Sequence, residues 1–193
     1  MSRFGVPTVL VAAAGVARAS PIMDMTVETW DLVLGANLRG VMLCTQAVAR
    51  LAAQAGEEGA IVLISSVNGV VADPGFSAYG ASKAGLYQFA RVAAREFGPL
   101  GIRINAVGPG PTETPALAQG LALAGYRDEV IRRTPLGRVG PPGDIAEAVV
   151  GLLKFEWVTG QALMADGGSS LNTGRSVWTQ MEEKVAPAAP GGC

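Results

Sequence analysis

The sequence predicts one α/β domain, with a parallel sheet in the middle and helices on both of its faces. Four short apolar segments are suited to buried strands, because strands covered on both faces are apolar throughout rather than alternating. Helical patterns separate these segments, and Gly- and Pro-rich turns end them. Such alternation along 193 residues favours a parallel sheet in three layers. The predicted strands are residues 8–12, 60–64, 102–107 and 161–165.

The first predicted strand, residues 8–12, lies in an apolar run that also resembles a signal peptide. Arg3, the run from 6 to 17 and the triplet Ala17-Arg18-Ala19 imitate its charged, apolar and small-residue regions. A buried strand that ends in a turn at Gly15 is the competing interpretation, and the alternation that follows favours it. No run reaches the roughly 18 apolar residues of a membrane span, so no membrane association is expected.

A helix follows, with Thr26 as its predicted N-cap. Residues at spacings of three and four form one stripe on it. The stripe comprises Trp30, Val33, Leu34, Asn37, Val41, Cys44, Val48 and Leu51. Asn37 is its polar member, and a buried amide costs stability unless it is hydrogen-bonded. A structural hydrogen bond and a role in proton relay both remain open for Asn37.

The second strand ends at Ser65-Ser66, and a loop over 67–77 leads into a helix from about Ala78 to Phe97. Small residues along this helix permit the close approach of another backbone. They are Gly80, Ala81, Ser82, Ala84 and Gly85.

The third strand, 102–107, runs into the turn Gly108-Pro109-Gly110-Pro111. A partly helical excursion is expected over 114–133, and Asp144 is the predicted cap of a helix over 145–154. The fourth strand closes on Asp166-Gly167-Gly168. The domain is expected to span 1–181, and the Pro- and Gly-rich segment 182–193 to be a disordered tail.

Composition excludes several classes of function. The chain contains no His, which rules out Ser-His-Asp and Cys-His catalysis and most catalytic zinc sites, and no metal site is expected. A net charge of −1 provides no excess of positive charge to bind the phosphates of a nucleic acid. Cys44 and Cys193 suggest no disulfide framework, which favours a reducing cytoplasm. The 49% hydrophobic content indicates surface buried against further subunits, so a homo-oligomer is expected.

Tyr79 and Lys83 are four residues apart in a predicted helix, so their side chains project from one face. An ammonium beside a phenol lowers the phenol pKa, and such a tyrosine can act as general acid or base. The pair alone is more typical of a solvated helix face than of a catalytic site. Ser66 strengthens the catalytic interpretation, because open α/β sheets bind ligands at the carboxyl ends of their strands. Its hydroxyl could hydrogen-bond a reacting oxygen.

Five ordered motifs give a more specific signal, and Ser66 precedes Tyr79 by 13 residues. They read Trp30-Asp31-x5-Asn37-Leu38-x-Gly40, Ile64-Ser65-Ser66-x2-Gly69, Tyr79-Gly80-Ala81-Ser82-Lys83-Ala84-Gly85, Arg103-x-Asn105-x3-Pro109-Gly110-x3-Thr114 and Asp166-Gly167-Gly168. With these motifs the chain resembles the short-chain dehydrogenase/reductase family over about residues 9–171. The resemblance implies a Rossmann-type fold, an NAD or NADP cofactor, a small carbonyl or alcohol substrate, and a dimer or tetramer.

The resemblance also implies roles for individual residues. Tyr79 would be the acid/base, while Lys83 would bind the nicotinamide ribose and lower the tyrosine pKa. Ser66 would orient the substrate oxygen, and Asn37 would hold a water linking Lys83 to solvent. The remaining cofactor-binding residues would lie along the nicotinamide half of the cofactor. A substrate lid would begin at Thr114. These residues are Ala13, Gly15, Pro109, Gly110, Thr112 and Thr114.

The sequence departs from the family at its start, so an N-terminally truncated fold is expected. The family's first strand, glycine-rich turn and helix have no counterpart, and no G-x-x-x-G-x-G follows any strand. Asn-Asn-Ala-Gly of the family is Ala12-Ala13-Ala14-Gly15 here, and the loop after Lys154 is short. Two hypotheses follow. The chain is either part of a family oxidoreductase or a catalytically silent remnant that serves as an interaction or structural subunit.

Overall fold

The structure is a computed structural model that describes residues 5–171, with Gln119 described by its backbone alone. Four strands, all parallel, form one sheet in the order β1-β2-β3-β4. Their bounds are β1 Val9–Ala12, β2 Gly59–Ile64, β3 Ile102–Pro109 and β4 Ala162–Ala165. All four predicted strands are confirmed to within two residues at each end. The predicted tail, the domain end at 181 and Cys193 lie outside the described residues.

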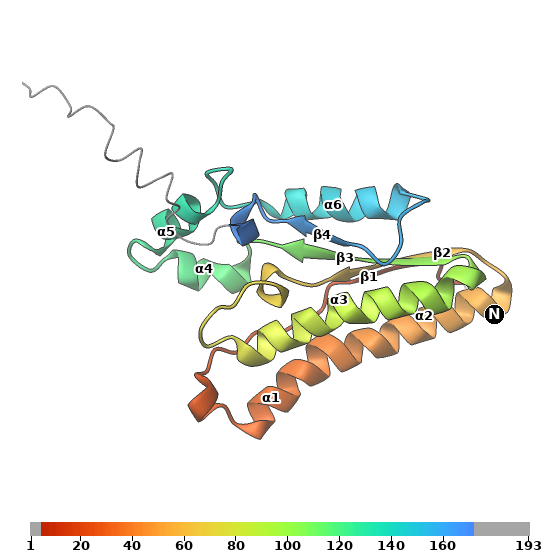
Figure 1. The fold of residues 1–193 in the computed structure, drawn as a ribbon, viewed down its shortest axis with the longest axis horizontal. Coiled ribbons are helices and arrows are strands. Elements are labelled where there is room, and N and C mark those ends of the chain that lie inside the picture. The colour runs from red at the N-terminus through yellow and green to blue at the C-terminus, as the bar shows by residue number, and fades with distance from the viewer. Residues whose placement is uncertain (1–4, 172–193) are drawn as a thin grey trace, which may run out of the picture.

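The fold has three layers, as the strand–helix alternation predicts (Figure 1). Helices α2 (Val41–Ala55) and α3 (Ser77–Phe97) cover one face, and α6 (Pro142–Lys154) covers the other. Neighbouring residues of β2 point to opposite faces, so Ile61 and Leu63 pack with α2 and α3, while Val62 packs with α6. Burial on both faces explains why β2 has no polar member.

The helix after Thr26 is interrupted, which corrects the prediction of one regular helix. Thr26 does cap α1 (Val27–Leu34), its hydroxyl accepting from Thr29 N at 3.2 Å, but a π-helical segment, Gly35–Gly40, separates α1 from α2. A π turn holds an extra residue, so the buried face beyond it is displaced by one position. Thr45, Ala49 and Ala52 are buried where Cys44, Val48 and Leu51 were predicted.

Among the described residues, one helical stretch, Val27–Ala55, is long and apolar enough to cross a membrane by length and composition alone. The sequence expectation concerned an uninterrupted run of about 18 apolar residues, and this stretch is not one, because Asn37 and Arg39 interrupt it. A single such stretch is weak evidence for a span, because a helix that covers a sheet passes the same test. This stretch buries Asn37 and Thr45 completely inside the fold.

Two further motif residues hold β3 to its neighbours. The Arg103 guanidinium donates to the carbonyls of Leu152, Leu153 and Phe155 at 2.8–3.1 Å, which satisfies the C-terminal end of α6. Asn105 donates to Val158 O at 2.8 Å and accepts from Gln161 N at 3.0 Å. These residues fix the connection between α6 and β4.

Asp144 does not cap α6, contrary to the prediction. The helix begins at Pro142 with Pro141 as the N-cap residue, because the fixed φ of proline suits the first helical position. Asp144 lies in the first turn, where its carboxylate pairs with Arg138 at 2.7 Å.

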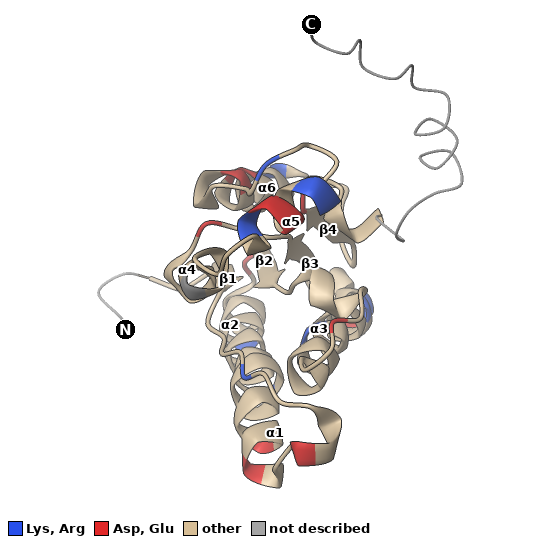
Figure 2. Ribbon diagram, turned by 90° about the vertical axis from the view of Figure 1, so that its left-hand side faces the viewer, with Lys and Arg blue, Asp and Glu red and all other residues tan. Residues whose placement is uncertain are grey.

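The surface is unevenly charged. Figure 2 shows charged residues around α5 (Tyr126–Arg133), α6 and the start of α1, whereas most of α2 carries none. Leu43 and Leu51 on α2 and Val92 on α3 are about half exposed. β1 is an edge strand of the described sheet, and its Val9 is 55% exposed. These apolar surfaces agree with the composition, and self-association stays a prediction.

Candidate active site

The predicted site residues gather at one edge of the sheet. Parallel strands end on the same side, and Ala13 and Gly15 follow β1, Ser66 follows β2, and Gly110 follows β3. Tyr79 and Lys83 lie in the first two turns of α3, which packs beside the loop after β2. Residues scattered over about 100 positions of the sequence thus share one edge.

Tyr79 and Ser66 form the centre of this group. The Tyr79 side chain is half-buried beside the Ser66 side chain, and the Ser66 hydroxyl accepts from Asn68 N at 3.2 Å. Burial raises the pKa of Tyr79 above its usual value, and the hydrogen bond with Ser66 lowers it by less. The expected lowering of this pKa is therefore not observed, because burial dominates. Tyr79 is a neutral phenol at pH 7, the form that donates a proton.

Lys83 is buried beside the tyrosine, with 4% of its surface exposed. Its ammonium donates to the carbonyl of Ile64 at 2.8 Å and lies 5.6 Å from the centroid of the Tyr79 ring. Burial lowers the pKa of Lys83 to about 8. An ammonium has three donors, and the hydrogen bond to Ile64 is the one found among residues 5–171. Lys83 therefore has donor capacity left for a ligand hydroxyl.

Asn37 is fully buried inside the π-helical segment, and the structure shows how its amide is satisfied. Its Oδ1 accepts from Val16 N at 2.8 Å, while its Nδ2 donates to Val16 O at 2.9 Å and to Ser82 Oγ at 3.1 Å. The structural alternative is thus documented: Asn37 ties the loop after β1 to α3. The relay role stays a prediction.

The absent side chain of Gly15 leaves space beside both groups. A Cβ on Gly15 would lie 3.2 Å from Asn37 Oδ1 and 3.5 Å from Lys83 Nζ. Ala13 and Gly15 are exposed, so this space opens to solvent next to a buried ammonium. Such a setting suits a polar ligand with a hydroxyl within reach of Lys83.

The segment after β3 is held by its own backbone and by β4. The Thr112 hydroxyl donates to Gly110 O at 2.9 Å, and Glu113 N donates to Gly140 O at 2.8 Å. Thr114 is the N-cap residue of α4 (Pro115–Leu121), but its hydroxyl makes no capping bond. The Thr114 hydroxyl therefore has no helix-capping role. Pro109 is the last residue of β3.

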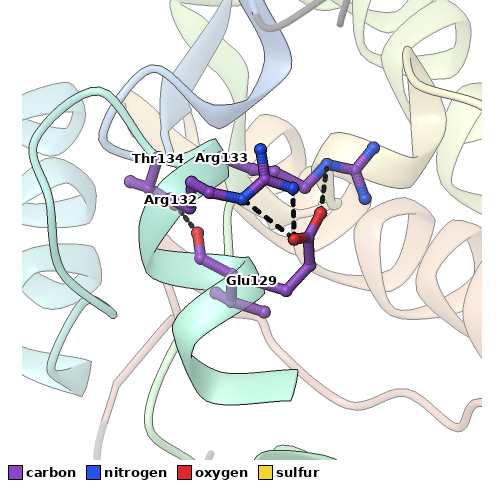
Figure 3. A network of polar contacts seen from close by, with 5 residues as sticks. Glu129, Arg132, Arg133 and Thr134 are labelled. Atoms are coloured by element: carbon purple, nitrogen blue, oxygen red, sulfur yellow. Dashed lines mark hydrogen bonds and ion pairs between the residues drawn. The ribbon is translucent and has the colours of Figure 1, made fainter. Parts of the chain in front are cut away.

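The predicted excursion over 114–133 consists of α4 and α5. Figure 3 shows the polar network of α5, in which Glu129 pairs with Arg132 and Arg133 and the Thr134 hydroxyl donates to Val130 O at 2.8 Å. The ion pairs are exposed and add little stability. Leu136 N donates to Gly167 O at 3.1 Å, which anchors the end of this excursion to the segment after β4.

A cavity of about 490 Å³ lies between this anchor and α6. Its walls include Pro111, Leu136, Ile145 and Met164. None of the four predicted catalytic residues lines it, so this cavity is separate from the group around Tyr79. Within residues 5–171, no group of three His, Cys, Asp or Glu side chains could hold a metal ion.

Sequence reasoning missed three polar residues of the site. Ser65 Oγ donates to Lys83 O at 2.7 Å, Ser82 accepts from Asn37, and the Tyr87 hydroxyl donates to Ser66 O at 2.7 Å. The spacing of Tyr87, four residues after Lys83 on the same helix face, was the available signal.

The pKa of Lys83 gives a testable pH dependence of stability. A lysine whose pKa falls to about 8 on folding binds its proton more weakly in the folded chain, so stability rises with pH above 8. We expect the free energy of unfolding to increase by about 2 kcal/mol between pH 8 and 10 through this group. Urea unfolding of the chain and of Lys83→Met measures the effect as the difference between two pH profiles. Parallel profiles would contradict it.

The fold and the polar group together define a Rossmann-type α/β protein with its site at the carboxyl edge of the sheet. A family model described as enoyl-(acyl carrier protein) reductase matches residues 1–170. The (3R)-3-hydroxyacyl-CoA dehydrogenase of Canis lupus familiaris is 38% identical over 164 residues, covering 84% of this chain and 62% of that protein. The 3-oxoacyl-(acyl-carrier-protein) reductase FabG of Thermotoga maritima is 38% identical over 170 residues, 87% of this chain and 68% of that protein.

A solved structure gives the same result. Gluconate 5-dehydrogenase from Burkholderia cenocepacia J2315, in complex with NADP and tartrate, superposes with a TM-score of 0.84 at 31% identity, over 88% of this chain and 67% of that one. The chain belongs to the short-chain dehydrogenase/reductase family. It spans 62–64% of the length of the canine and rat (3R)-3-hydroxyacyl-CoA dehydrogenases.

Proposed function

We propose that this chain carries the proton-transfer site of an NAD(P)-dependent oxidoreductase that interconverts a carbonyl and a secondary alcohol. The observation that carries the proposal is the meeting of the Tyr79 phenol, the Ser66 hydroxyl and the buried Lys83 ammonium at one edge of the sheet. The relatives' names, which are of dehydrogenases and reductases, support the same class of reaction.

Each side chain has a defined task in this reaction. Ser66 hydrogen-bonds the substrate oxygen and holds it beside Tyr79. In reduction the Tyr79 phenol gives its proton to that oxygen, and in oxidation the phenolate takes the proton from the alcohol. A pKa raised by burial keeps Tyr79 protonated at neutral pH, which is the form that reduction requires. Lys83, with a pKa of about 8, returns a proton toward Tyr79. Asn37 holds a water that links Lys83 to solvent.

We place the cofactor in the space that adjoins Lys83. A nicotinamide cofactor would supply or accept the hydride at the carbonyl carbon. The ammonium of Lys83 is placed to bind a ribose hydroxyl where Gly15 leaves room. We assign Ala13, Pro109, Gly110, Thr112 and Thr114 to the same cofactor, because they lie at or after the carboxyl ends of β1 and β3. No residue in these positions discriminates NAD from NADP, so both are candidates.

Hydride transfer by the full chain tests the proposal. We expect NADH or NADPH oxidation, followed by nicotinamide absorbance, with a 3-oxoacyl thioester or a keto sugar acid at millimolar cofactor. Ser66→Ala is expected to lower kcat, and the matched control Ser170→Ala, distant in the sequence and after β4, to leave it unchanged. Lack of turnover with every carbonyl in both cofactors would refute the proposal for this chain.

A binding titration measures how tightly this chain holds the cofactor. Because no glycine-rich pyrophosphate turn is found in the sequence, we expect NADH and NADPH to bind weakly, without saturation at micromolar concentration. The quenching of tryptophan fluorescence measures binding, and the chain has three tryptophans. Saturation at micromolar cofactor would contradict this expectation. If turnover is absent, the alternative is a catalytically silent structural subunit.

A further inference from the structure

Tyr87 is a buried tyrosine that the mechanism above does not use. It lies on α3, one turn after Lys83 and two turns after Tyr79, and is 6% exposed. Its hydroxyl donates to the backbone carbonyl of Ser66 at 2.7 Å and lies 3.7 Å from the sulfur of Met164. The Tyr87 hydroxyl thus holds the main chain of Ser66, and the side chain of Ser66 lies beside Tyr79.

Two glycines make the space that Tyr87 occupies. A Cβ on Gly69 would lie 2.6 Å from Tyr87 Cε2, and a Cβ on Gly108 would lie 2.3 Å from the Tyr87 hydroxyl oxygen. Both distances are too short for any real side chain. The loop after β2 and the strand β3 thus both lack a side chain where the tyrosine passes. The ring is confined between two backbones, so its hydroxyl has little freedom to leave Ser66.

A second hydrogen bond ties the same strand end to α3. Ser65 Oγ donates to the carbonyl of Lys83 at 2.7 Å. The residue pair at the end of β2 is therefore bonded to α3 at Lys83 and at Tyr87, on the same side of the helix as Tyr79. The distance between the Ser66 and Tyr79 hydroxyls depends on this attachment, because the two residues come from different elements.

We propose that Tyr87 is a positioning residue that fixes the Ser66 backbone on α3, so that the Ser66 hydroxyl stays directed at Tyr79. Its kinetic consequence rests on the proposed function, but its effect on Tyr79 does not. Removing the hydroxyl takes one of two donors from the Ser66 carbonyl, which also accepts from Gly69 N at 3.0 Å, and frees the strand end from α3 at this point. The hydrogen bond from Ser66 lowers the pKa of Tyr79, so a looser Ser66 raises that pKa further.

The variant Tyr87→Phe tests the proposal because it keeps the ring between the two glycines. We expect kcat to fall about three- to tenfold, as for the loss of one hydrogen bond, with KM for cofactor unchanged. In a Ser66→Ala background the same substitution is expected to have no further effect on kcat. A multiplicative loss in that background would show that Tyr87 acts by general stability, and would overturn the proposal.

A spectroscopic readout keeps the inference separate from the proposed function. The chain has three tyrosines, so absorbance titration of tyrosinate resolves Tyr79 by difference against Tyr79→Phe chains. We expect the pKa of Tyr79 to be higher in Tyr87→Phe than in the unaltered chain. The exposed tyrosine gives the matched control, since Tyr126→Phe is expected to leave Tyr79 unchanged.

The outcomes are distinct. If the chain shows no turnover but the pKa of Tyr79 is higher in Tyr87→Phe, the inference stands and the proposed function fails. An unshifted Tyr79 in a folded Tyr87→Phe chain ends the inference, whatever the turnover. If that variant unfolds, Ser65→Ala removes the other bond between the end of β2 and α3, and an unshifted Tyr79 in that folded chain ends the inference.

Discussion

Replacing Tyr79 with Phe is expected to lower kcat by a factor of about 10²–10⁴ while leaving the fold intact. The substitution removes one oxygen, and with it the proton that reaches the substrate oxygen. The half-buried ring and its contact with Phe76 remain, at a centroid distance of 6.2 Å. Steady-state turnover with the best carbonyl found measures the effect, and circular dichroism verifies the fold.

Tyr126→Phe is the control for this substitution. Tyr126 begins α5 and is 41% exposed, so losing its hydroxyl should change neither turnover nor stability. The two variants differ from the unaltered chain by the same atoms. Turnover retained in Tyr79→Phe at the level of Tyr126→Phe would remove Tyr79 from the mechanism.

Replacing Gly110 with Ala should lower the free energy of unfolding of the chain by about 2–3 kcal/mol. A Cβ there would lie 2.6 Å from Asp166 Cα and 2.9 Å from Asp166 O. The backbone of Asp166 cannot move aside as the flexible end of a side chain can. Gly110 N also donates to Ala165 O at 3.1 Å, which holds the two strand ends together. Relieving the contact would separate the ends of β3 and β4. Urea unfolding monitored by circular dichroism measures the loss.

Gly143→Ala is the matched control, because a Cβ at Gly143 meets no atom within 4 Å. It lies in the first turn of α6, where alanine is the better helix former, so its stability should stay equal or rise slightly. A Gly110→Ala chain as stable as Gly143→Ala would show that β3 and β4 tolerate the added carbon. Gly110 would then be explained by the proposed cofactor alone.

Local patterns were sufficient for the strands and for the pairing of Tyr79 with Lys83. β2 and β3 are buried on both faces, so they have the apolar composition that a local pattern can reveal. Tyr79 and Lys83 belong to one helix, and a helix fixes which residues share a face. The cap at Thr26 is equally local. Each of these features depends on neighbours within a few residues.

Helix phase and helix starts were harder to predict. The π-helical segment displaced the buried face of α2 by one residue, and a regular period of 3.6 contains no signal for it. At α6 the two prolines began the helix before Asp144, whose carboxylate pairs with Arg138 instead. In both cases a competing local preference overrode the pattern that the prediction used.

By itself, the sequence determined the class of fold, the order of its strands along the chain and the residues that converge on the site, because these follow from apolar pattern, helical spacing and ordered motifs. Only the tertiary structure decided the pKa directions of Tyr79 and Lys83, since burial depends on everything packed around a side chain. It alone also placed the Tyr87 hydroxyl on Ser66, between Gly69 and Gly108. Those contacts join residues from separate elements, and no local pattern contains the distances between them.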